Sequence, residues 1–330
     1  MKNQKSKQRW RSILIWTLWV LLLQFVLINI SAALYADKLT HLHAPADNTR
    51  KKPPSANIVS KTWHLFTGPI LYRRSLSGEP AFTFSTIILK TRKAIPIEAW
   101  YSKTDSVSKG TMILVHGLTG NKGLLLDEAN AFRSFGYNVL LIDLRSHGNS
   151  GGGTTTIGYK ESEEVRLAYD YIVQAGEKKI FLWGASMGAV AVIKALSDYQ
   201  LHPEGIIIEM PFLSLQSHLK SQARFLGFPR QPFAFLTTFW IGIEQGFNGL
   251  GFKTTKYAKN INCPVLMQYG EKDELVLGYE TDEIYGAIPG AHKKLVIYDE
   301  AGHESFLRKD PAGWKREVSV FLEQAPKAIF

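Results

Sequence analysis

The amino-acid sequence predicts an α/β domain with a mostly parallel central sheet covered by helices on both faces, preceded by one N-terminal transmembrane helix. Two observations carry this prediction. Short apolar runs alternate with amphipathic stretches from residue 111 onward, a pattern typical of buried parallel strands separated by helices. An uncharged apolar run at residues 12–36 exceeds the roughly 20 residues that a helix needs to cross a bilayer.

Composition narrows the possible functions. The 330-residue chain is 45% hydrophobic, which excludes a largely disordered protein, and its one cysteine, Cys263, excludes a disulfide framework. We interpret Cys263 as a small buried residue. The histidines are scattered, and the one close pair, His41 and His43, has no acidic or thiol partner nearby in the sequence. We therefore expect no metal and no cofactor.

The net charge of +10 is placed unevenly along the chain. Residues 1–61 contain 10 Lys and Arg against 2 Asp and Glu, whereas the rest of the chain is nearly neutral. A nucleic-acid-binding protein is expected to carry its basic surplus on the folded domain. Because the surplus lies in an N-terminal leader instead, we expect no nucleic-acid partner.

Residues 1–11 are interpreted as a cytoplasmic basic leader and residues 12–36 as a transmembrane signal-anchor helix. Five Lys and Arg in the leader favour a cytoplasmic N-terminus, which places the rest of the chain on the extracytoplasmic side. One alternative is a cleaved signal peptide, because residues 31–33 have small side chains at a suitable spacing. The apolar run is longer than the core of about 7–15 residues usual in such peptides. A buried core helix is a further alternative, but the run has too few polar residues to face water.

Residues 37–62 contain prolines and a basic cluster without helical or strand periodicity, so they are predicted to be a linker to a folded domain at 63–330. Two extended segments between residues 82 and 102 indicate a hairpin at its start. Buried strands are predicted at 111–115, 138–142, 179–183, 205–209, 264–269 and 294–298. Helices are predicted at about 124–135, 160–174, 187–198 and 312–324, and a long insertion occupies 211–260.

A candidate nucleophile follows the strand predicted at 179–183. The chain reads GASMG at residues 184–188, a G-x-S-x-G pattern between a strand and a helix. A sharp turn at this place exposes the serine hydroxyl above the sheet and requires small flanking residues. The pattern therefore predicts Ser186 as a nucleophile, the alternative being a structural glycine-rich turn.

A serine hydroxyl needs a base that takes its proton, and the base needs a partner that orients it. His303 lies in the loop after the last predicted strand, which makes it the candidate base. Asp273 follows the preceding strand and is the candidate acid, with Glu271 and Glu274 as rivals. The order Ser186, Asp273, His303 is the order expected when these groups meet at one edge of such a sheet.

The developing oxyanion needs backbone donors. The first predicted donor is the N–H of Met187, which follows the nucleophile at the start of a helix. The second is the N–H of Leu118, in the HGLTG segment after the strand at 111–115. We interpret His116 as structural, since His303 already supplies the base.

These motifs resemble those of the α/β-hydrolase superfamily of serine hydrolases. They are VHGLTG (115–120), DLRSHGNS (143–150), GASMG (184–188), YGEKDELV (269–276) and AGHESF (301–306). The sequence is similar to membrane-associated members of the serine aminopeptidase S33-like kind, although many relatives have a proline within residues 275–277. The resemblance implies the α/β-hydrolase fold, the nucleophile at Ser186, the acid at Asp273, the base at His303 and oxyanion donors at Leu118 and Met187.

The segment DLRSHGNS matches a part of the family pattern that is usually structural. We interpret its residues Asp143, Arg145 and His147 as bracing a loop rather than contacting the substrate.

The insertion at 211–260 is predicted to be a helical cap above Ser186. Its aromatic side chains either line an acyl-chain pocket or only pack the cap onto the domain: Phe212, Phe225, Phe228, Phe233, Phe235, Phe239, Trp240, Phe247 and Phe252. Its basic residues Lys220, Arg224 and Arg230 either meet an anionic head group or form a solvated face.

The sequence thus predicts a membrane-anchored serine hydrolase that cleaves acyl or lipid-like carboxylic esters through an acyl-enzyme. A peptidase or amidase with the same triad is the first alternative, and a non-catalytic binding module is the second. The oligomeric state stays open.

Overall fold

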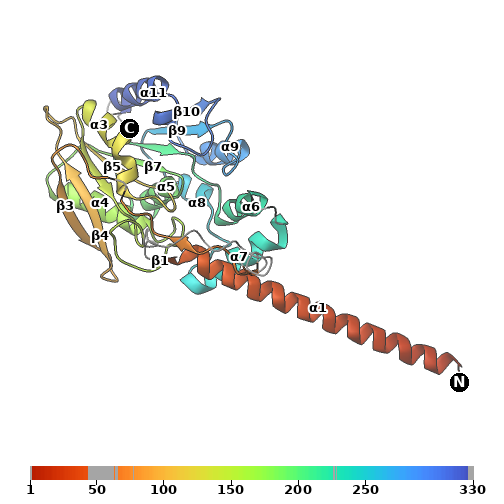
Figure 1. The fold of residues 1–330 in the computed structure, drawn as a ribbon. Helices are drawn as coiled ribbons and strands as arrows, with labels where there is room; N and C mark the ends of the chain where they lie inside the picture. Colours follow the sequence, from red (N-terminus) through yellow and green to blue (C-terminus); the bar gives the residue numbers. More distant parts are fainter. Residues whose placement is uncertain are drawn as a thin grey trace.

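A computed structural model describes residues 2–43, 63, 66–76, 78–225, 227 and 229–325, with side chains from residue 7 onward. Figure 1 shows a rounded α/β body from which one long helix, α1 (Lys2–Thr40), projects at the N-terminal end. The body has a central sheet with helices packed against its two faces.

The sheet contains eight strands within the described residues, in the order β10-β9-β8-β7-β5-β6-β4-β3. In chain order they are β3 (Ser85–Lys90), β4 (Pro96–Ser102), β5 (Thr111–Val115), β6 (Asn138–Ile142), β7 (Ile180–Ala185), β8 (Gly205–Glu209), β9 (Val265–Gly270) and β10 (Lys293–Tyr298). The strands β5 to β10 are parallel, whereas β4 is antiparallel to both of its neighbours. The predicted α/β fold with a mostly parallel sheet is confirmed.

The strand order creates a crevice where the site can form. The chain passes from β5 to β6 on one side and later returns to β7 on the other, so β5 pairs with both. Val115, the last residue of β5, lies opposite Gly184 near the end of β7. Loops that leave neighbouring strands in opposite directions open a crevice at their carboxyl ends.

Helices cover both faces of the sheet because the strands bury side chains on both sides. In β5, Ile113 and Val115 pack into one hydrophobic cluster, and Met112 and Leu114 into the other. This alternation is what the pleat of a strand imposes. The first cluster lies against α4 (Ser162–Gln174), α5 (Met187–Tyr199), α8 (Thr254–Ala258) and α9 (Gly278–Ala287). The second lies against α3 (Leu126–Ser134), α10 (Phe306–Lys309) and α11 (Pro311–Gln324).

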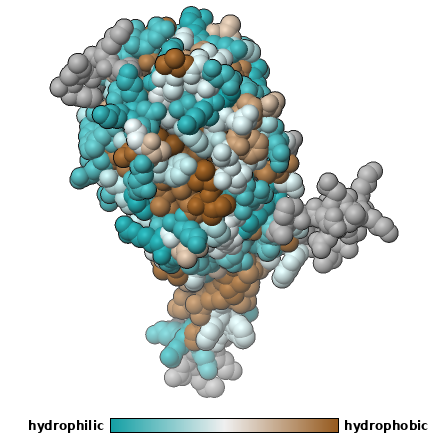
Figure 2. All heavy atoms as spheres, turned by 90° about the vertical axis from the view of Figure 1, so that its left-hand side faces the viewer, coloured by the Kyte–Doolittle hydropathy of each residue, from teal (hydrophilic) through white to brown (hydrophobic). Residues whose placement is uncertain are grey.

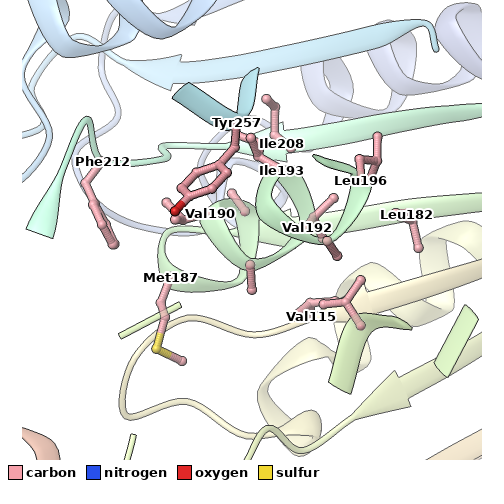
Figure 3. Packing of buried hydrophobic residues seen from close by; sticks show 14 of the residues in the cluster. Val115, Leu182, Met187, Val190, Val192, Ile193, Leu196, Ile208, Phe212 and Tyr257 are labelled. Atoms are coloured by element: carbon pink, nitrogen blue, oxygen red, sulfur yellow. The ribbon is translucent and has the colours of Figure 1, made fainter. Parts of the chain in front are cut away.

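Helix α5 lies at the centre of the first cluster. Figure 3 shows Val190 and Ile193 of this helix packed among the strand residues Val115, Leu182 and Ile208. All five side chains are completely buried. The helix that follows the candidate nucleophile is therefore held rigidly against the sheet.

The N-terminal helix is longer than the predicted span at 12–36, since it runs without a break from Lys2 to Thr40. Its segment from Lys7 to Thr40 is long and apolar enough to cross a membrane, and the most apolar part of it is entirely exposed. In Figure 2 this part of the helix is the brown stem below the body.

The end of α1 packs onto the body. Ala32, Tyr35, Ala36 and Leu39 are buried, and their spacing of three and four residues places them on one face of the helix. The next residues form β1 (Leu42–His43), which pairs with β2 (Leu71–Tyr72). The predicted linker at 37–62 thus begins with helix and strand, and its remainder from 44 to 62 lies outside the described residues.

The insertion at 211–260 contains α6 (Leu215–Phe225), α7 (Arg230–Gln245) and α8. Helices α6 and α7 pack against each other, and α7 also packs against α1. The 3-10 helix η1 (Lys122–Leu125) completes the helical elements that adjoin the site.

Candidate active site

Ser186 occupies the turn between β7 and α5. Its backbone has φ +52° and ψ −117°, a conformation that a non-glycine residue rarely adopts. The turn is held in place because the Ser186 N–H donates a 2.8 Å hydrogen bond to the carbonyl oxygen of Glu209, at the end of β8. Strained residues of this kind occur where function requires a particular side-chain position.

Two glycines allow this turn. A Cβ atom on Gly184 would lie 2.7 Å from the carbonyl oxygen of Gly188. A Cβ atom on Gly188 would lie 2.2 Å from the carbonyl oxygen of Val115. The glycines of the G-x-S-x-G pattern therefore permit the close approach of α5 to β5 and β7.

The structure brings Ser186, His303 and Asp273 together in one chain of hydrogen bonds. The Nε2 atom of His303 lies 3.0 Å from Ser186 Oγ, and its Nδ1 atom lies 2.7 Å from Asp273 Oδ2. His303 comes from the loop after β10 and Asp273 from the loop after β9. The imidazole can thus exchange a proton with the serine on one side while the carboxylate orients it on the other.

Asp273, rather than its acidic neighbours, meets the histidine. The Asp273 side chain is completely buried, and its Oδ1 atom accepts hydrogen bonds from the N–H groups of Leu275 and Val276 at 2.7 and 2.8 Å. Glu271 and Glu274 are exposed. The two backbone donors leave Oδ2 free to receive the Nδ1–H of His303.

The predicted oxyanion donors lie on two segments that adjoin Ser186. Met187 is the first residue of α5, so its N–H has no acceptor within the helix. Leu118 follows Gly117, where a Cβ atom would lie 3.3 Å from both Ala185 O and Ser186 Cβ. The loop after β5 therefore passes directly beside the candidate nucleophile.

Two buried histidines brace that loop. The Thr119 N–H donates to His147 Nε2 at 3.2 Å, and the Leu144 N–H donates to His116 Nε2 at 3.0 Å. Burial lowers the pKa of both His116 and His147 to about 4, so each is neutral at neutral pH and can accept a hydrogen bond. Both ring nitrogens of each histidine are hydrogen-bonded to the backbone, so both act as loop braces in this geometry.

The other residues singled out in DLRSHGNS also serve the loops. Arg145 donates from Nε to Glu164 Oε1 at 2.7 Å and pairs with Glu163 at 3.1 Å. The Asp143 carboxylate accepts the N–H of Lys122 at 2.7 Å and that of Asn149 at 2.8 Å. The Arg145 contacts fix the loop after β6 against α4, and the contact between Asp143 and Lys122 fixes it against the segment after β5.

A cavity of about 660 Å³ opens above Ser186 and His303. Its lining is mixed, with a large apolar share from several segments of the chain. Apolar side chains around it include Leu39, Pro69, Leu71, Leu118, Leu124, Leu125, Trp183, Met210, Phe225 and Leu275. Polar side chains include Arg74, Glu128, Glu209, His218, Gln222, Glu304, Ser305 and Arg308.

Several of these lining residues were not singled out from the sequence. Leu39 belongs to α1, and His218 belongs to α6, where it accepts a 2.9 Å hydrogen bond from the side-chain amide of Gln222. Burial lowers the pKa of His218 to about 4. Glu209 is held at the rim by the indole N–H groups of Trp183 and Trp314, at 3.0 and 2.8 Å from Oε1. No local sequence pattern marks these residues, because they reach the cavity only through tertiary packing.

The cap aromatics serve mainly to pack the cap onto the body. Phe212 and Phe252 are buried in the core, and Phe233, Trp240 and Phe247 pack against it. Phe225 lines the cavity, whereas Phe235 and Phe239 are exposed, and Phe228 lies outside the described residues.

The cap cations do not line the cavity. Arg224 donates to the carbonyl oxygen of Glu274, and the arginines on the cavity wall are Arg74 and Arg308.

Comparison with known proteins relates this fold to hydrolases. A family model described as serine aminopeptidase, S33, matches residues 106–239. The chain is 27% identical over 189 residues to lysophosphatidylserine lipase ABHD12 of Danio rerio, covering 54% of this chain and 47% of that one. It thus spans about half the length of that relative. It is also 26% identical over 266 residues to the uncharacterized protein YqkD of Bacillus subtilis, covering 77% and 86% of the two chains.

Among solved structures, the Pyrococcus furiosus esterase Pf2001 superposes with a TM-score of 0.63 at 24% identity. The superposition covers 76% of this chain and 98% of the esterase. At this identity the likeness concerns the fold, and it places the sheet and its covering helices in the same arrangement.

Proposed function

Because the chain belongs to the α/β-hydrolase superfamily, we propose that it is a membrane-anchored serine hydrolase that cleaves acyl or lipid-like carboxylic esters. The observation that carries the proposal is the hydrogen-bonded chain from Ser186 through His303 to Asp273 at the floor of a partly apolar cavity. A solvated loop histidine would have no reason to lie between a strained serine and a buried carboxylate.

The reaction proceeds in two steps of acyl transfer. His303 Nε2 takes the hydroxyl proton as Ser186 Oγ attacks the ester carbonyl carbon, and the N–H groups of Leu118 and Met187 stabilise the oxyanion. Collapse of the intermediate breaks the bond to the alcohol, which leaves with the proton from His303. Water then gives a proton to His303 and attacks the acyl carbonyl carbon. Collapse of this second intermediate breaks the bond to Ser186 Oγ, which takes the proton back from His303 as the acid leaves. Asp273 keeps the imidazole in the required tautomer throughout.

The cavity and the relatives favour a substrate with an acyl chain. Apolar side chains supply much of the wall, as is usual for sites that bury an apolar ligand. ABHD12 is named a lysophosphatidylserine lipase, and Pf2001 is an esterase. One name describes a lipase acting on a lysophospholipid and the other an esterase, which supports a lipid-like ester as substrate here.

Membrane anchoring through α1 is part of the proposal. The exposed apolar helix is long enough to span a bilayer, and the basic residues before it favour a cytoplasmic N-terminus. Because residues 32–39 pack on the body, the anchor and the hydrolase form one unit rather than a domain on a loose tether.

Active-site labelling tests the proposal. A fluorophosphonate should label the full chain in membranes, and Ser186→Ala should abolish labelling while the surface control Ser319→Ala retains it. Unlabelled wild type would contradict the enzymatic function and leave a binding module as the alternative.

A substrate panel then separates the two enzymatic candidates, since the matched family model is described as a serine aminopeptidase. We expect hydrolysis of acyl esters, with a preference among chain lengths. Cleavage of aminoacyl amides without cleavage of any acyl ester would establish the peptidase instead.

A further inference from the structure

Helix α7 exposes an apolar stripe on its surface. Phe235, Phe239 and Ile243 recur every four residues, which places them on one face, and they are 45%, 41% and 59% exposed. Between the first and the last of them α7 contains no charged residue. Three large apolar side chains in a row on a surface helix commonly mark an interaction site.

The stripe lies beside the helix proposed to span the membrane. Figure 1 shows α7 next to α1 at the point where α1 enters the body. The indole Nε1–H of Trp240 donates a 3.3 Å hydrogen bond to Asn29 Oδ1 in α1, and the side-chain amide of Gln245 donates to Thr40 Oγ1 at 3.1 Å. Trp240 directly follows Phe239, so the apolar stripe is adjacent to this contact.

The contact at Asn29 marks a boundary along α1. The large apolar side chains from Ile13 to Ile28 are exposed, as expected of a segment surrounded by lipid, whereas Ala32 and Tyr35 are buried by the body. The membrane surface therefore lies close to Asn29 when α1 spans the bilayer. Phe239, which directly precedes Trp240, is then close to the level of the membrane surface.

A second segment meets α1 at this level. Ser31 Oγ donates a 2.6 Å hydrogen bond to the carbonyl oxygen of Phe66. Near Phe66, the side chains of Trp63 and Ile70 are 59% and 40% exposed. Aromatic side chains favour the membrane interface. Exposed apolar groups thus occur on two segments that contact α1 at Asn29 and Ser31, directly after its exposed apolar part.

The candidate active site adjoins the same region. Leu39, less than three turns after Asn29 on α1, lines the cavity above Ser186. Phe225 at the end of α6 also lines it and is 73% exposed. The cavity wall is therefore built partly from the membrane helix and from a cap helix that packs on α7.

We propose that the stripe Phe235, Phe239 and Ile243 inserts into the interface of the bilayer that α1 crosses, and that the cavity takes single-chain amphiphiles directly from that bilayer. The proposal extends the proposed function and rests on its membrane anchor. The occupant of the stripe is lipid, because the stripe adjoins, at Trp240, an apolar helix of membrane-spanning length.

Site-specific fluorophores test the insertion without reference to activity. Single cysteines replace Phe239 or Ile243 in the full chain, are labelled with nitrobenzoxadiazole, and are studied in vesicles. Wild type, whose Cys263 is buried, is the labelling blank. The matched control is Ile88→Cys, a 52% exposed isoleucine on β3 at the far edge of the sheet. We expect blue-shifted emission and quenching by doxyl lipids at 239 and 243, and quenching by aqueous iodide at 88. Iodide quenching at all three positions would overturn the proposal.

A kinetic comparison tests the delivery of substrate. The variant Phe235→Gln/Phe239→Gln/Ile243→Gln should insert more weakly into the membrane interface, because insertion scales with the apolar area that is buried there. The mole fraction of a lysophospholipid in vesicles that gives half-maximal rate should therefore rise by about tenfold. Hydrolysis of a water-soluble short-chain ester should stay within about twofold, as for surface substitutions away from a site. The control variant is Ile88→Gln/Val173→Gln/Val320→Gln, which changes three exposed apolar residues elsewhere.

The outcomes separate the two proposals. An equal loss on both substrates, or no loss on either, would overturn the delivery of substrate from the bilayer. Wild type that cleaves neither substrate would contradict the proposed function, and the fluorophores would still decide whether α7 inserts.

Discussion

Lys122 and Asp143 form an ion pair in which both side chains are completely buried. The Lys122 ammonium also lies 2.9 Å from Glu98 Oε1 and 4.6 Å from the centre of the Trp100 ring. Lys122 begins η1, four residues after Leu118, and Asp143 follows β6. The pair therefore ties the loop that carries a predicted oxyanion donor to the neighbouring strand.

Removing one partner of this pair should be strongly destabilising. In Asp143→Asn the Lys122 charge stays buried and loses its fully buried partner, a change that typically costs about 3–5 kcal/mol. The matched control is Asp105→Asn, which breaks the pair with Arg133 at an aspartate that is 95% exposed and should cost about 0–1 kcal/mol. Chemical denaturation in detergent measures both. Equal losses in the free energy of unfolding for the two variants would show that the buried pair stabilises the fold no more than the exposed one.

The orienting acid can be identified by amide substitution. Asp273→Asn removes the charge that holds the His303 tautomer, so the turnover rate should fall by about 10⁴-fold, as in comparable triads. Glu271→Gln makes the same chemical change two residues away, at an exposed side chain, and should leave the rate within about twofold. The comparison uses a soluble short-chain ester. A large loss in Glu271→Gln with little loss in Asp273→Asn would reverse the assignment.

The sheet and the site motifs could be predicted because their signals are local. The predicted strands at 111–115, 138–142 and 205–209 match β5, β6 and β8 residue for residue, since each is an apolar run bounded by polar or small residues. The turn at Ser186 was predictable from its glycines. Asp273 and His303 could be proposed as its partners because the ends of parallel strands meet at one edge of the sheet.

The remaining features depend on packing between distant segments. The burial of Tyr35 and Leu39 requires a body for α1 to pack against. The linker at 37–62 was predicted from its prolines, its basic cluster and the absence of helical or strand periodicity. His218 enters the cavity only because α6 folds over it. The exposed cap residues Phe235 and Phe239 are indistinguishable in sequence from the buried Phe212 and Phe252.

The glycine after the candidate nucleophile should not tolerate a side chain. In Gly188→Ala the new Cβ would lie 2.2 Å from Val115 O and 2.6 Å from His116 O, both backbone atoms of the strand that leads to the oxyanion loop. Overpacking of this kind costs about 1–3 kcal/mol or more, and the shift should also abolish fluorophosphonate labelling. Gly153→Ala, where no atom lies within 4 Å of a new Cβ, is the control and should change stability by less than about 0.5 kcal/mol.

The orientation that we propose for the chain in the membrane rests on the charges before the apolar part of α1. A basic leader at residues 1–11 should stay in the cytoplasm, so protease added outside intact cells or spheroplasts should remove the body. Replacing the five leader Lys and Arg by Gln should reduce this accessibility, because the bias that sets the orientation is lost. Full protection of the wild-type body would contradict the proposed topology.

Glu209 should make stability fall as the pH rises. Burial raises the pKa of its carboxyl to about 8 in the folded chain, well above the ordinary value of 4.5. Between these two values the folded state holds a proton that the unfolded state has lost, so each increase in pH across this window favours unfolding.

Gln at position 209 keeps an oxygen that can accept the N–H groups of Trp183 and Trp314 but cannot ionise. Glu209→Gln should therefore resemble wild type near pH 5 and exceed its Tm by a few degrees near pH 8. Thermal unfolding at both pH values measures the effect, and Glu271→Gln, which makes the same chemical change at an exposed side chain, is the control. A constant difference between wild type and Glu209→Gln at the two pH values would mean that Glu209 is ionised in the folded protein.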